Sequence, residues 1–573
     1  MHPENSNPDA ASLKLAYNKA RVDHRKLERS FKAKASFERD QKLSQGSSHV
    51  FGLIRSAKRN KSGKIQKLTV GKRTYLGESV KDGFFDHISQ LKSRNSDNLS
   101  SSASFQKFSA DYRNILEVFR NGPPIPALSE KDSFGIMQKM KPQVTDMFGI
   151  TMNHFNFAGP PGWRHFHLLI NSLIADINNT CIEEINIAYA CILFKGHGKE
   201  KTSARSYRTI STCPQVAKGL DIYVKDLNLD GWNEDQSDVQ FQGEGSSHEL
   251  AALLLTETVQ HSLFTLQKPV YVLYLDAESA FDVVLGELHV RRVFHANTND
   301  QSLLYINNRL GSRKTIIDWN GQLMGPVADE QGLEQGGVSS SDLYKMFGKE
   351  QLTLAQNSLL GVPLGEADDL IVSAIGQADD TLLVSNDIKK LQYLLQLSEA
   401  FCSRYHVTLS PGKTKLQVFF TRKMREEVRY AMVTNPIKLS DKDIKFSESA
   451  EHVGVLRSTN GNQATILARI TEHKRALGAV LHTGMARGHR GNPAASLGIE
   501  QLYGLPVLLS GLSSLFLLKS EESAVEQHHK ETISNLQRLH PGTPSPVVCF
   551  LAGTLPGSAH LHLRQLSIFS MIT

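Results

Sequence analysis

Residues 369–385 constrain the fold of this chain more than any other stretch. Two apolar runs rich in leucine and β-branched residues flank a turn of small residues, and this pattern predicts a buried hairpin with Asp379 and Asp380 near its tip. Adjacent carboxylates repel each other, and on a protected hairpin they are costly unless a cation lies between them. The pair therefore points to a divalent metal, although an isolated Asp-Asp pair is also typical of a solvated surface turn.

A second Ala-Asp-Asp sequence lies nearby, at residues 367–369. The residues before it, from Gly361 to Gly365, have the composition of a loop, so this copy precedes the hairpin and does not form its turn. We therefore assign the metal site to Asp379 and Asp380.

A third carboxylate, Asp276, ends the strongly apolar strand predicted at residues 270–275. With the hairpin, it supplies the set of acids that two-metal phosphoryl transfer requires. A glycine-rich loop at residues 329–342 precedes a helix, and a further helix and strand, at residues 391–405 and 415–420, follow the hairpin. This order is compatible with a split βαβ sheet backed by helices, in which the carboxylates converge at one end of the antiparallel sheet.

A basic hairpin is predicted at residues 191–211, where two apolar strands flank a turn that contains glycine and lysine. Its tip would carry Lys195, Lys201 and Arg208. Such a tip can clamp a triphosphate, because arginine offers a bidentate fork and lysine a point charge. Taken alone, the same pattern is also typical of a turn that is only solvated.

The net charge of +7 is concentrated near the N-terminus. Residues 1–100 hold 21 Lys and Arg against 10 Asp and Glu, whereas the rest of the chain holds 44 against 48, from totals of 65 and 58. A basic leading segment suits a polyanion such as nucleic acid, although a solvated charged helix has the same composition. Residues 1–45 are predicted to be helical, and the Ser/Asn-rich residues 93–105 to be a linker.

No apolar run approaches the ~18 residues that a membrane-spanning helix needs, and residues 1–6 do not resemble a signal peptide. These observations predict a protein of the nucleus and cytoplasm that binds no membrane. The five cysteines show no CxxC pair and no zinc-like spacing with histidine, and His165 and His167 lack a third ligand nearby. We therefore expect neither disulfides nor zinc.

Several of these segments, in this order, resemble the successive palm motifs of reverse transcriptases, in particular those of non-LTR (LINE-type) retrotransposons. Residues 206–211 resemble that family's fingers motif, and residues 451–455 resemble the strand at the base of its thumb. The resemblance extends from about residue 125 to the C-terminus. The palm-like segments are Leu275–Asp282, Gln335-Gly336 with the serines that follow, Ala378-Asp379-Asp380 and Lys413-Thr414.

The resemblance implies an α+β protein with the right-hand polymerase fold, comprising fingers, a palm with a split βαβ antiparallel sheet, and a helical thumb. It implies an RNA-directed DNA polymerase that extends a DNA primer on an RNA template with dNTPs. The corresponding domains would be a basic helical N-terminal region at 1–124, fingers and palm at 125–425, and a thumb with a C-terminal helical region at 426–573. The resemblance leaves the oligomeric state open.

The resemblance also implies roles for individual residues. Asp276, Asp379 and Asp380 would hold two Mg²⁺ ions, with Mn²⁺ as an alternative, assisted by the backbone carbonyl of Ala277. Phe281 would lie beneath the sugar and exclude a 2′-hydroxyl. The remaining roles would be triphosphate binding by Arg208 with Lys195 or Lys201, lining of the template-nucleotide pocket by Gln335 and Gly336, and proton donation to pyrophosphate by Lys413.

This chain departs from the family pattern at four positions. The family commonly has an aromatic residue where Gln377 stands, Pro where Glu334 stands and Asn where Ser410 stands, and Lys is frequent where Ser279 stands. None of these changes removes a metal ligand, so we expect activity. The endonuclease and cysteine-rich knuckle that often accompany this family are not recognised, which suggests a fragment or a truncated genomic copy.

Two other functions compete with an active polymerase. One is a decayed or domesticated retroelement protein that binds nucleic acid through its basic N-terminal part and polymerises nothing. The intact acids Asp276, Asp379 and Asp380 argue against it. The other is a viral RNA-dependent RNA polymerase, which shares the palm chemistry but is disfavoured by Phe281.

Overall fold

The computed structural model describes residues 65–93, 103–177, 185–196, 198–242, 246–296, 298–311, 313–365, 370–480 and 493–572, with residues 19, 22, 25 and 26. From residue 65 onward, the described residues divide into two compact units, within Lys64–Val453 and Gly454–Thr573. The helix predicted over residues 1–45, most of the linker predicted over 93–105 and the second Ala-Asp-Asp copy lie outside the described residues.

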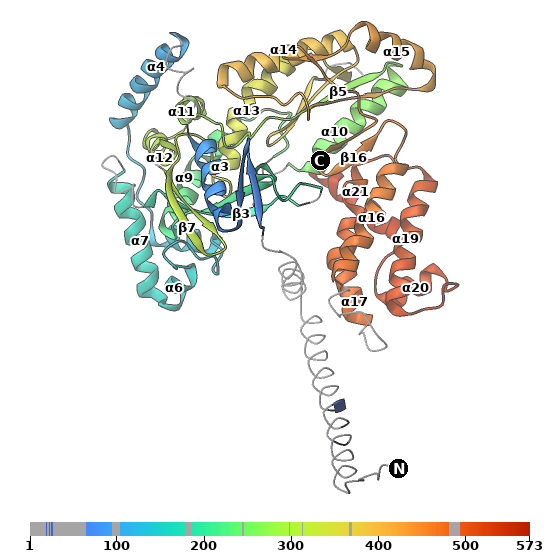
Figure 1. Ribbon diagram of the computed structural model, residues 1–573, viewed down its shortest axis with the longest axis horizontal. Helices are drawn as coiled ribbons and strands as arrows, with labels where there is room; N and C mark the ends of the chain where they lie inside the picture. Colours follow the sequence, from blue (N-terminus) through green and yellow to red (C-terminus); the bar gives the residue numbers. More distant parts are fainter. Residues whose placement is uncertain are drawn as a thin grey trace, which may run out of the picture. The chain divides into compact units, whose positions relative to one another are not determined.

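The first unit contains a four-stranded antiparallel sheet with the strand order β10-β11-β5-β12, of which β5 is labelled in Figure 1. All six residues of β5 are buried, as expected for a leucine- and valine-rich strand covered on both faces. This confirms the strand and the hairpin predicted from the sequence. The strands are β5 (Val270–Leu275), β10 (Ala374–Gln377), β11 (Asp380–Ser385) and β12 (Lys415–Phe419).

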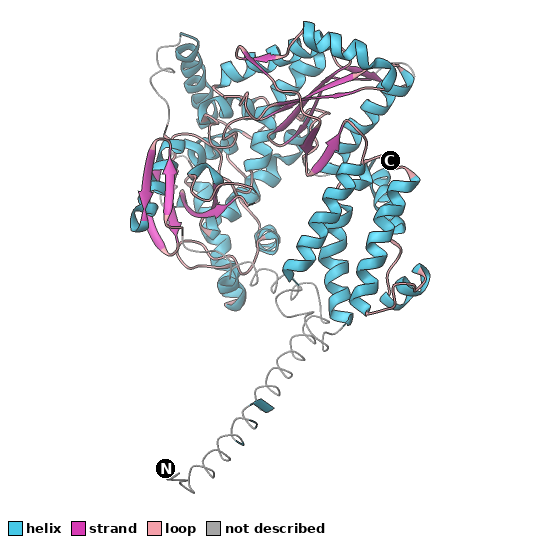
Figure 2. Ribbon diagram, turned by 45° about the vertical axis from the view of Figure 1, so that its right-hand side comes forward, coloured by secondary structure: helices cyan, strands magenta, loops and turns pink. Residues whose placement is uncertain are grey.

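Three helices pack on this sheet, and Figure 2 shows strands in magenta among cyan helices. Helix α14 (Ile388–Tyr405) lies against β5 and β11, and its buried stripe includes Leu391, Leu394 and Leu395. Helices α10 (His248–Gln260) and α13 (Ser340–Asn357) pack against β10. The helices predicted after the glycine-rich loop and after the hairpin are both confirmed.

A second four-stranded sheet has the order β4-β3-β6-β7, in which β3 and β6 are parallel and the other neighbours antiparallel. Its β3–β4 pair confirms the basic hairpin, with Phe194 opposite Tyr207 next to the turn. One apolar core continues from helices α7 and α9 into β5 and α14. The remaining bounds are β3 (Ile187–Phe194), β4 (Tyr207–Thr212), β6 (Lys314–Trp319), β7 (Gln322–Ala328), α7 (Gly159–Ala175) and α9 (Gln215–Glu234).

Residues upstream of the predicted polymerase region also belong to the first unit. In β1 (Lys67–Val70), the Thr69 amide donates to the Thr202 carbonyl at 2.6 Å. In α3 (Val80–Lys92), the Phe84 ring packs 4.9 Å from that of Tyr207. The compact unit is therefore wider than the predicted 125–425 range, and the functions assigned to 1–124 and 426–573 stay predictions.

The other helices and short strands of the first unit surround these two sheets. The helices are α4 (Ala103–Arg120), α5 (Glu130–Lys139), α6 (Met152–Phe157), α11 (Gly286–Phe294), α12 (Asp300–Gly311) and α15 (Arg425–Thr434). The strands are β2 (Arg73–Leu76), β8 (Val362–Leu364), β9 (Leu370–Val372), β13 (Lys438–Leu439), β14 (Lys442–Asp443) and β15 (Ser449–His452).

The second unit is mainly helical over its described residues, with strand β16 (Val455–Ser458) packed against α16. Its interior is partly polar, because His473 and Glu500 are fully buried and their side chains lie 3.0 Å apart. The helices are α16 (Gln463–Val480), α17 (Pro493–Ile499), α18 (Leu505–Leu509), α19 (Lys519–Gln537), α20 (Ser545–Ala552) and α21 (Gly557–Ile572).

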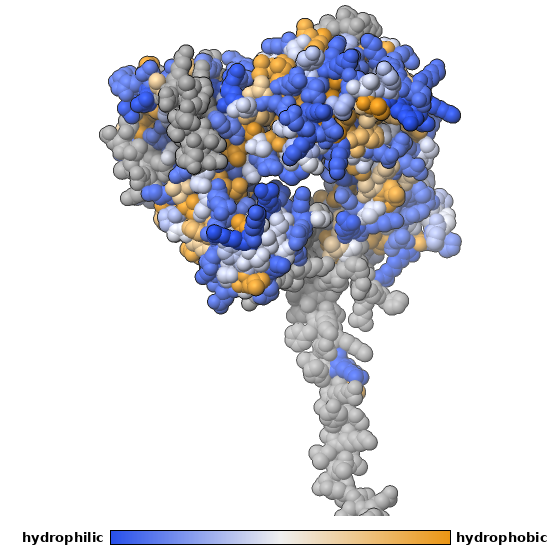
Figure 3. All heavy atoms as spheres, turned by 45° about the horizontal axis from the view of Figure 1, so that its top comes forward, coloured by the Kyte–Doolittle hydropathy of each residue, from blue (hydrophilic) through white to orange (hydrophobic). Residues whose placement is uncertain are grey.

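Hydrophilic side chains occupy much of the face drawn in Figure 3, and apolar residues form patches between them. Among the described residues, no helix combines the length and the apolarity that crossing a membrane would require.

Candidate active site

The pairing of β5 with β11 brings together carboxylates that lie far apart in the sequence. Leu275 pairs with Thr381 in an antiparallel register, so one further step places Asp276 opposite Asp380. Residues directly opposite in an antiparallel pair share a face, with Cβ atoms roughly 4.5–5.5 Å apart. The sheet therefore presents Asp276 and Asp380 side by side at its end.

The third carboxylate lies in the turn between β10 and β11. Gln377 pairs with Asp380, which leaves Ala378 and Asp379 as the two turn residues. Ala378 has a φ of +57°, the left-handed conformation that tight two-residue hairpins need and that alanine rarely adopts. This tight turn keeps Asp379 next to Asp380.

Gln240 holds this strained turn from outside the hairpin, and no motif in the sequence indicated it. Its side-chain oxygen accepts a hydrogen bond from the Ala378 amide at 3.2 Å, and the side chain is buried. The backbone beside it is bonded to the same strand, since Phe241 N donates to the Gly376 carbonyl at 2.8 Å. A lone glutamine in an irregular segment carries no periodic signal that sequence reasoning could have used.

The pKa values of Asp379 and Asp380 are both raised. The surrounding protein, which displaces water, and then the charges of Asp379 and Asp276 raise the pKa of Asp380 to about 6. The same displacement and the charge of Asp276 raise the pKa of Asp379, against the opposing effect of Arg208. Both side chains still reach solvent. Bringing the acids together is thus unfavourable without a cation, which is the electrostatic signature of a cation site.

Lys413 lies on the opposite side of Asp276. Its Nζ donates to Asp276 Oδ2 at 2.9 Å, and the nearby Ser410 amide donates to the Asp276 carbonyl at 2.8 Å. Residues 408–414 therefore brace the end of β5, because Glu278 N also donates to the Thr408 carbonyl at 2.8 Å.

The donor set suits a hard divalent cation, because carboxylate and carbonyl oxygens are the preferred ligands of Mg²⁺. The coordination is not preformed, however. Within the ranges that the structure describes, no three His, Cys, Asp or Glu side chains are arranged to hold a metal. A physical reason is visible at Asp276, where one carboxylate oxygen is already bonded to Lys413.

Phe281 and the glycine-rich loop meet beside the carboxylates. The half-buried Phe281 ring stacks on Tyr344, with centroids 4.4 Å apart and planes 18° apart, and its carbonyl accepts a hydrogen bond from Leu333 N at 2.7 Å. Gln335 Nε2 lies 3.4 Å from both carboxylate oxygens of Asp282. Tyr344 and Asp282, which were not predicted as site residues, thus contact the predicted residues Phe281 and Gln335.

Gly336 lets the loop approach strand β4 of the second sheet closely. Its φ is +110°, and an added Cβ would lie 2.8 Å from the Ser211 carbonyl oxygen. The Ser211 amide donates to the Gln335 carbonyl at 2.8 Å. Only glycine fits such a backbone conformation without strain, so residues 335–336 are fixed between β4 and Phe281.

Two of the three predicted triphosphate-binding cations, Arg208 and Lys195, lie near each other, and Arg208 also lies near Asp379. Arg208, exposed on β4, acts on the pKa of Asp379. Burial and then the charge of Arg208 lower the pKa of Lys195, and Lys413 acts in the same direction. Lys201 Nζ lies 5.9 Å from the centre of the Phe194 ring. Of the two predicted alternatives, Lys195 therefore lies with Arg208 and Lys413.

Comparison with known proteins agrees with this geometry. The family model described as reverse transcriptase (RNA-dependent DNA polymerase) matches residues 198–446, a range that contains Arg208, Phe281, Gln335 and the three acids. No curated protein matches the chain. Such a domain implies binding of a nucleic-acid template and primer. Residues 198–446 are thus a reverse transcriptase domain, and the protein is an RNA-directed DNA polymerase, a nucleotidyltransferase.

Proposed function

We propose that this chain is the reverse transcriptase of a non-LTR retrotransposon, which extends a primer 3′-hydroxyl with dNTPs on an RNA template by two-metal nucleotidyl transfer. The observation that carries the proposal is the register that sets Asp276 opposite Asp380, with Asp379 in the adjoining turn. The non-LTR origin rests on the ordered motifs described above. In the right-hand fold proposed here, β4 and β3 belong to the fingers, β5, β10, β11 and β12 to the palm, and the C-terminal helices to the thumb.

The metal ions would be held by Asp276, Asp379 and Asp380, with the Ala277 carbonyl as a further ligand. When bound, two Mg²⁺ or Mn²⁺ ions supply activation of the primer hydroxyl and neutralisation of charge on the leaving pyrophosphate. Among the protein's own groups, Arg208 and Lys195 bind the triphosphate by charge-assisted hydrogen bonds. Lys413, whose Nζ lies 2.9 Å from Asp276 Oδ2, would be the proton donor to the pyrophosphate.

The sugar and base are positioned by the loop and the stacked ring. Phe281, held against Tyr344, would pack beneath the deoxyribose where a 2′-hydroxyl would otherwise fit. Gln335 and Gly336 would line the pocket for the templating nucleotide, since their backbone is fixed to β4.

The proposal is tested by primer extension on an RNA template with Mg²⁺, comparing the parent with Asp379→Asn. This variant keeps the shape of the side chain and removes its charge, so we expect extension to fall by roughly 100- to 1000-fold, as for loss of a principal transition-state stabiliser. The matched control is Asp226→Asn, at an exposed aspartate whose pair with Lys139 is far from the acids in sequence.

The outcomes separate the competing functions. Extension in the parent and in Asp226→Asn, lost in Asp379→Asn, supports the polymerase. Template binding without extension by the parent supports the inactive nucleic-acid-binding protein. Efficient incorporation of ribonucleotides by the parent points instead to an RNA polymerase.

A further inference from the structure

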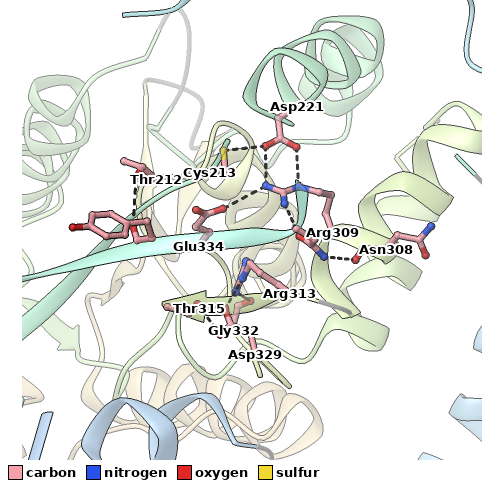
Figure 4. Close-up of polar contacts among 12 residues, drawn as sticks. Thr212, Cys213, Asp221, Asn308, Arg309, Arg313, Thr315, Asp329, Gly332 and Glu334 are labelled. Atoms are coloured by element: carbon pink, nitrogen blue, oxygen red, sulfur yellow. Dashed lines mark hydrogen bonds and ion pairs between the residues drawn. The ribbon is translucent and has the colours of Figure 1, made fainter. Parts of the chain in front are cut away.

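Two buried arginines lie behind the glycine-rich loop, at the end of helix α12 (Figure 4). Arg309 is 8% exposed and Arg313 is 4% exposed. A buried guanidinium is costly unless its charge is paired and its N–H groups are bonded. The partners of these two side chains therefore show what the protein gains from burying them.

Arg309 links helix α9 to the glycine-rich loop. Its Nε and Nη2 each donate to a carboxylate oxygen of Asp221 at 3.1 Å, and Nη1 donates to Asn186 Oδ1 at 2.5 Å. Nη2 also lies 3.6 Å from Glu334 Oε2. Figure 4 shows the guanidinium between the two carboxylates, with Asp221 on one side and Glu334 on the other.

Arg313 holds the beginning of the same loop. Its Nε donates to Asp329 Oδ2 at 2.5 Å, and Nη2 donates to the Gly332 carbonyl at 3.2 Å. The Asp329 carboxylate is completed by Thr315 Oγ1 at 2.8 Å and by Lys92 Nζ at 2.6 Å. Arg313 therefore binds the beginning of residues 329–334, and Arg309 contacts their end.

Residues 329–334 lead directly into Gln335 and Gly336, which are proposed above to line the nucleotide pocket. Glu334 precedes Gln335, whose carbonyl is bonded to Ser211 N and whose side chain faces Asp282. Glu334 is 6% exposed, and its second oxygen, Oε1, has no hydrogen-bond partner among the described residues. Its carboxylate therefore depends on Arg309, and a shift at residue 334 would pass to Gln335 through one peptide bond.

We propose that Arg309 and Arg313 are positioning residues of the polymerase, which clamp residues 329–334 and so set Gln335 and Gly336 against the incoming nucleotide and its template base. The inference rests on the proposed function. Apolar side chains of similar volume would stabilise such a site about as well, whereas the guanidinium fork fixes direction as well as distance. Glu334 is the contact that ties this clamp to the pocket.

The test uses Glu334→Gln in the full chain, because it removes the charge while keeping the size of the side chain. Amide hydrogen exchange of the free protein is compared for peptides covering residues 207–214, 332–338 and 270–275. Steady-state primer extension then gives KM for dNTP and kcat. The control is Asp235→Asn, which breaks the half-buried ion pair with Lys349 in the same unit.

We expect exchange to accelerate at 207–214 and 332–338 but not at 270–275, and KM for dNTP to rise roughly tenfold with little change in kcat, because small misplacements of positioning groups cost up to ~100-fold. Asp235→Asn should change neither quantity. Glu334→Asp keeps the negative charge on a shorter side chain. If the shorter acid still reaches Arg309, KM for dNTP rises less than in Glu334→Gln, and this result supports the clamp.

Each other result decides the matter. Unchanged exchange at 332–338, or faster exchange there with an unchanged KM in an active parent, overturns the clamp. Faster exchange that includes 270–275 also overturns it, because the residue then merely stabilises the whole unit. If the parent extends no primer but exchange in Glu334→Gln is faster only at 207–214 and 332–338, the clamp is supported and the proposed function is rejected.

Discussion

Asp276 has a carboxylate opposite it on β11 and an ammonium group bonded to one of its oxygens. A metal ion bound at Asp276 would compete with Lys413 for that oxygen, because both need the same lone pairs. The raised pKa values of Asp379 and Asp380 indicate repulsion among the three acids. A metal ion bound between them would relieve this repulsion, which favours the metal ion over Lys413.

At the same scale, Gln240 supports the strained turn that carries Asp379. Gln240→Ala removes the side-chain acceptor of the part-buried Ala378 amide, a loss of about 0.5–1.5 kcal/mol for a typical hydrogen bond. Because ~1.4 kcal/mol equals a factor of ten in rate, we expect kcat for primer extension to fall by up to roughly tenfold, with KM for dNTP less affected.

The control for this prediction is Gln392→Ala. Gln392 makes a comparable bond, from Nε2 to the Lys438 carbonyl at 3.0 Å, but at an exposed position. It should leave kcat unchanged. An equal loss in both variants, or none in Gln240→Ala, would show that the turn does not depend on Gln240.

At the scale of single elements, helix α11 carries a histidine that burial keeps neutral. His289 is fully buried, neither ring nitrogen has a partner among the described residues, and burial, with Arg292, lowers its pKa from 6.5 to about 3. Because the folded pKa lies below the unfolded one, its contribution to stability is complete above pH 6.5 and declines as pH falls toward 3.

His289→Leu should remove that part of the acid sensitivity. Urea denaturation at pH 7.5 and 5.5 would show the parent losing more unfolding free energy than the variant, by up to ~1.4 kcal/mol for each pH unit below 6.5. The exposed His295, which caps the C-terminus of the same helix, provides the control, as His295→Leu. If the unfolding free energy of His289→Leu shows the parent's pH dependence, protonation of His289 is not the cause of the acid sensitivity.

The elements of the sheet that carries the candidate site were predictable because each is encoded locally. The β5 and β11 sequences are short apolar runs with flanking turns, and α14 shows a helical stripe. The site residues Asp276, Asp379 and Asp380 followed from the same runs. Gln240, Tyr344 and the Arg309–Asp221 pair were not predictable, because each acts through a partner distant in sequence and has no periodic or motif signal.

At the scale of the whole molecule, the basic leading part of the chain separates into two regions. Residues 1–63 hold 14 Lys and Arg against 6 Asp and Glu and precede the compact polymerase unit. Residues 65–93 belong to that unit, where Leu68 and Phe84 are buried and Lys92 is bonded to Asp329. Charge alone gave no reason to divide them, because burial depends on contacts with β4 and β6.

Two deletions test this division. Removing residues 1–63 should make the slope of log affinity against log salt shallower in a filter-binding titration, since fewer counterions are released, while the unfolding temperature stays the same. Removing residues 1–93 should also lower the unfolding temperature, by roughly 5–10 °C, because a buried Phe alone contributes about 3–5 kcal/mol.

Each deletion has its own contradicting result. An unchanged salt slope without residues 1–63 would reject a nucleic-acid-binding role for that segment. An unchanged unfolding temperature without residues 1–93 would reject the packing of α3 on the second sheet.

The register between β5 and β11 determines which changes in length the gene can tolerate. Side chains alternate between the two faces of a strand, so deleting one codon between Thr381 and Ser385 would place Asp380 on the opposite face relative to the rest of β11, most of which is buried. Losing two codons would restore the parity, though at a shorter strand. Insertions or deletions of an odd number of codons in β11 should therefore be selected against, whereas those in the surface loops should be tolerated.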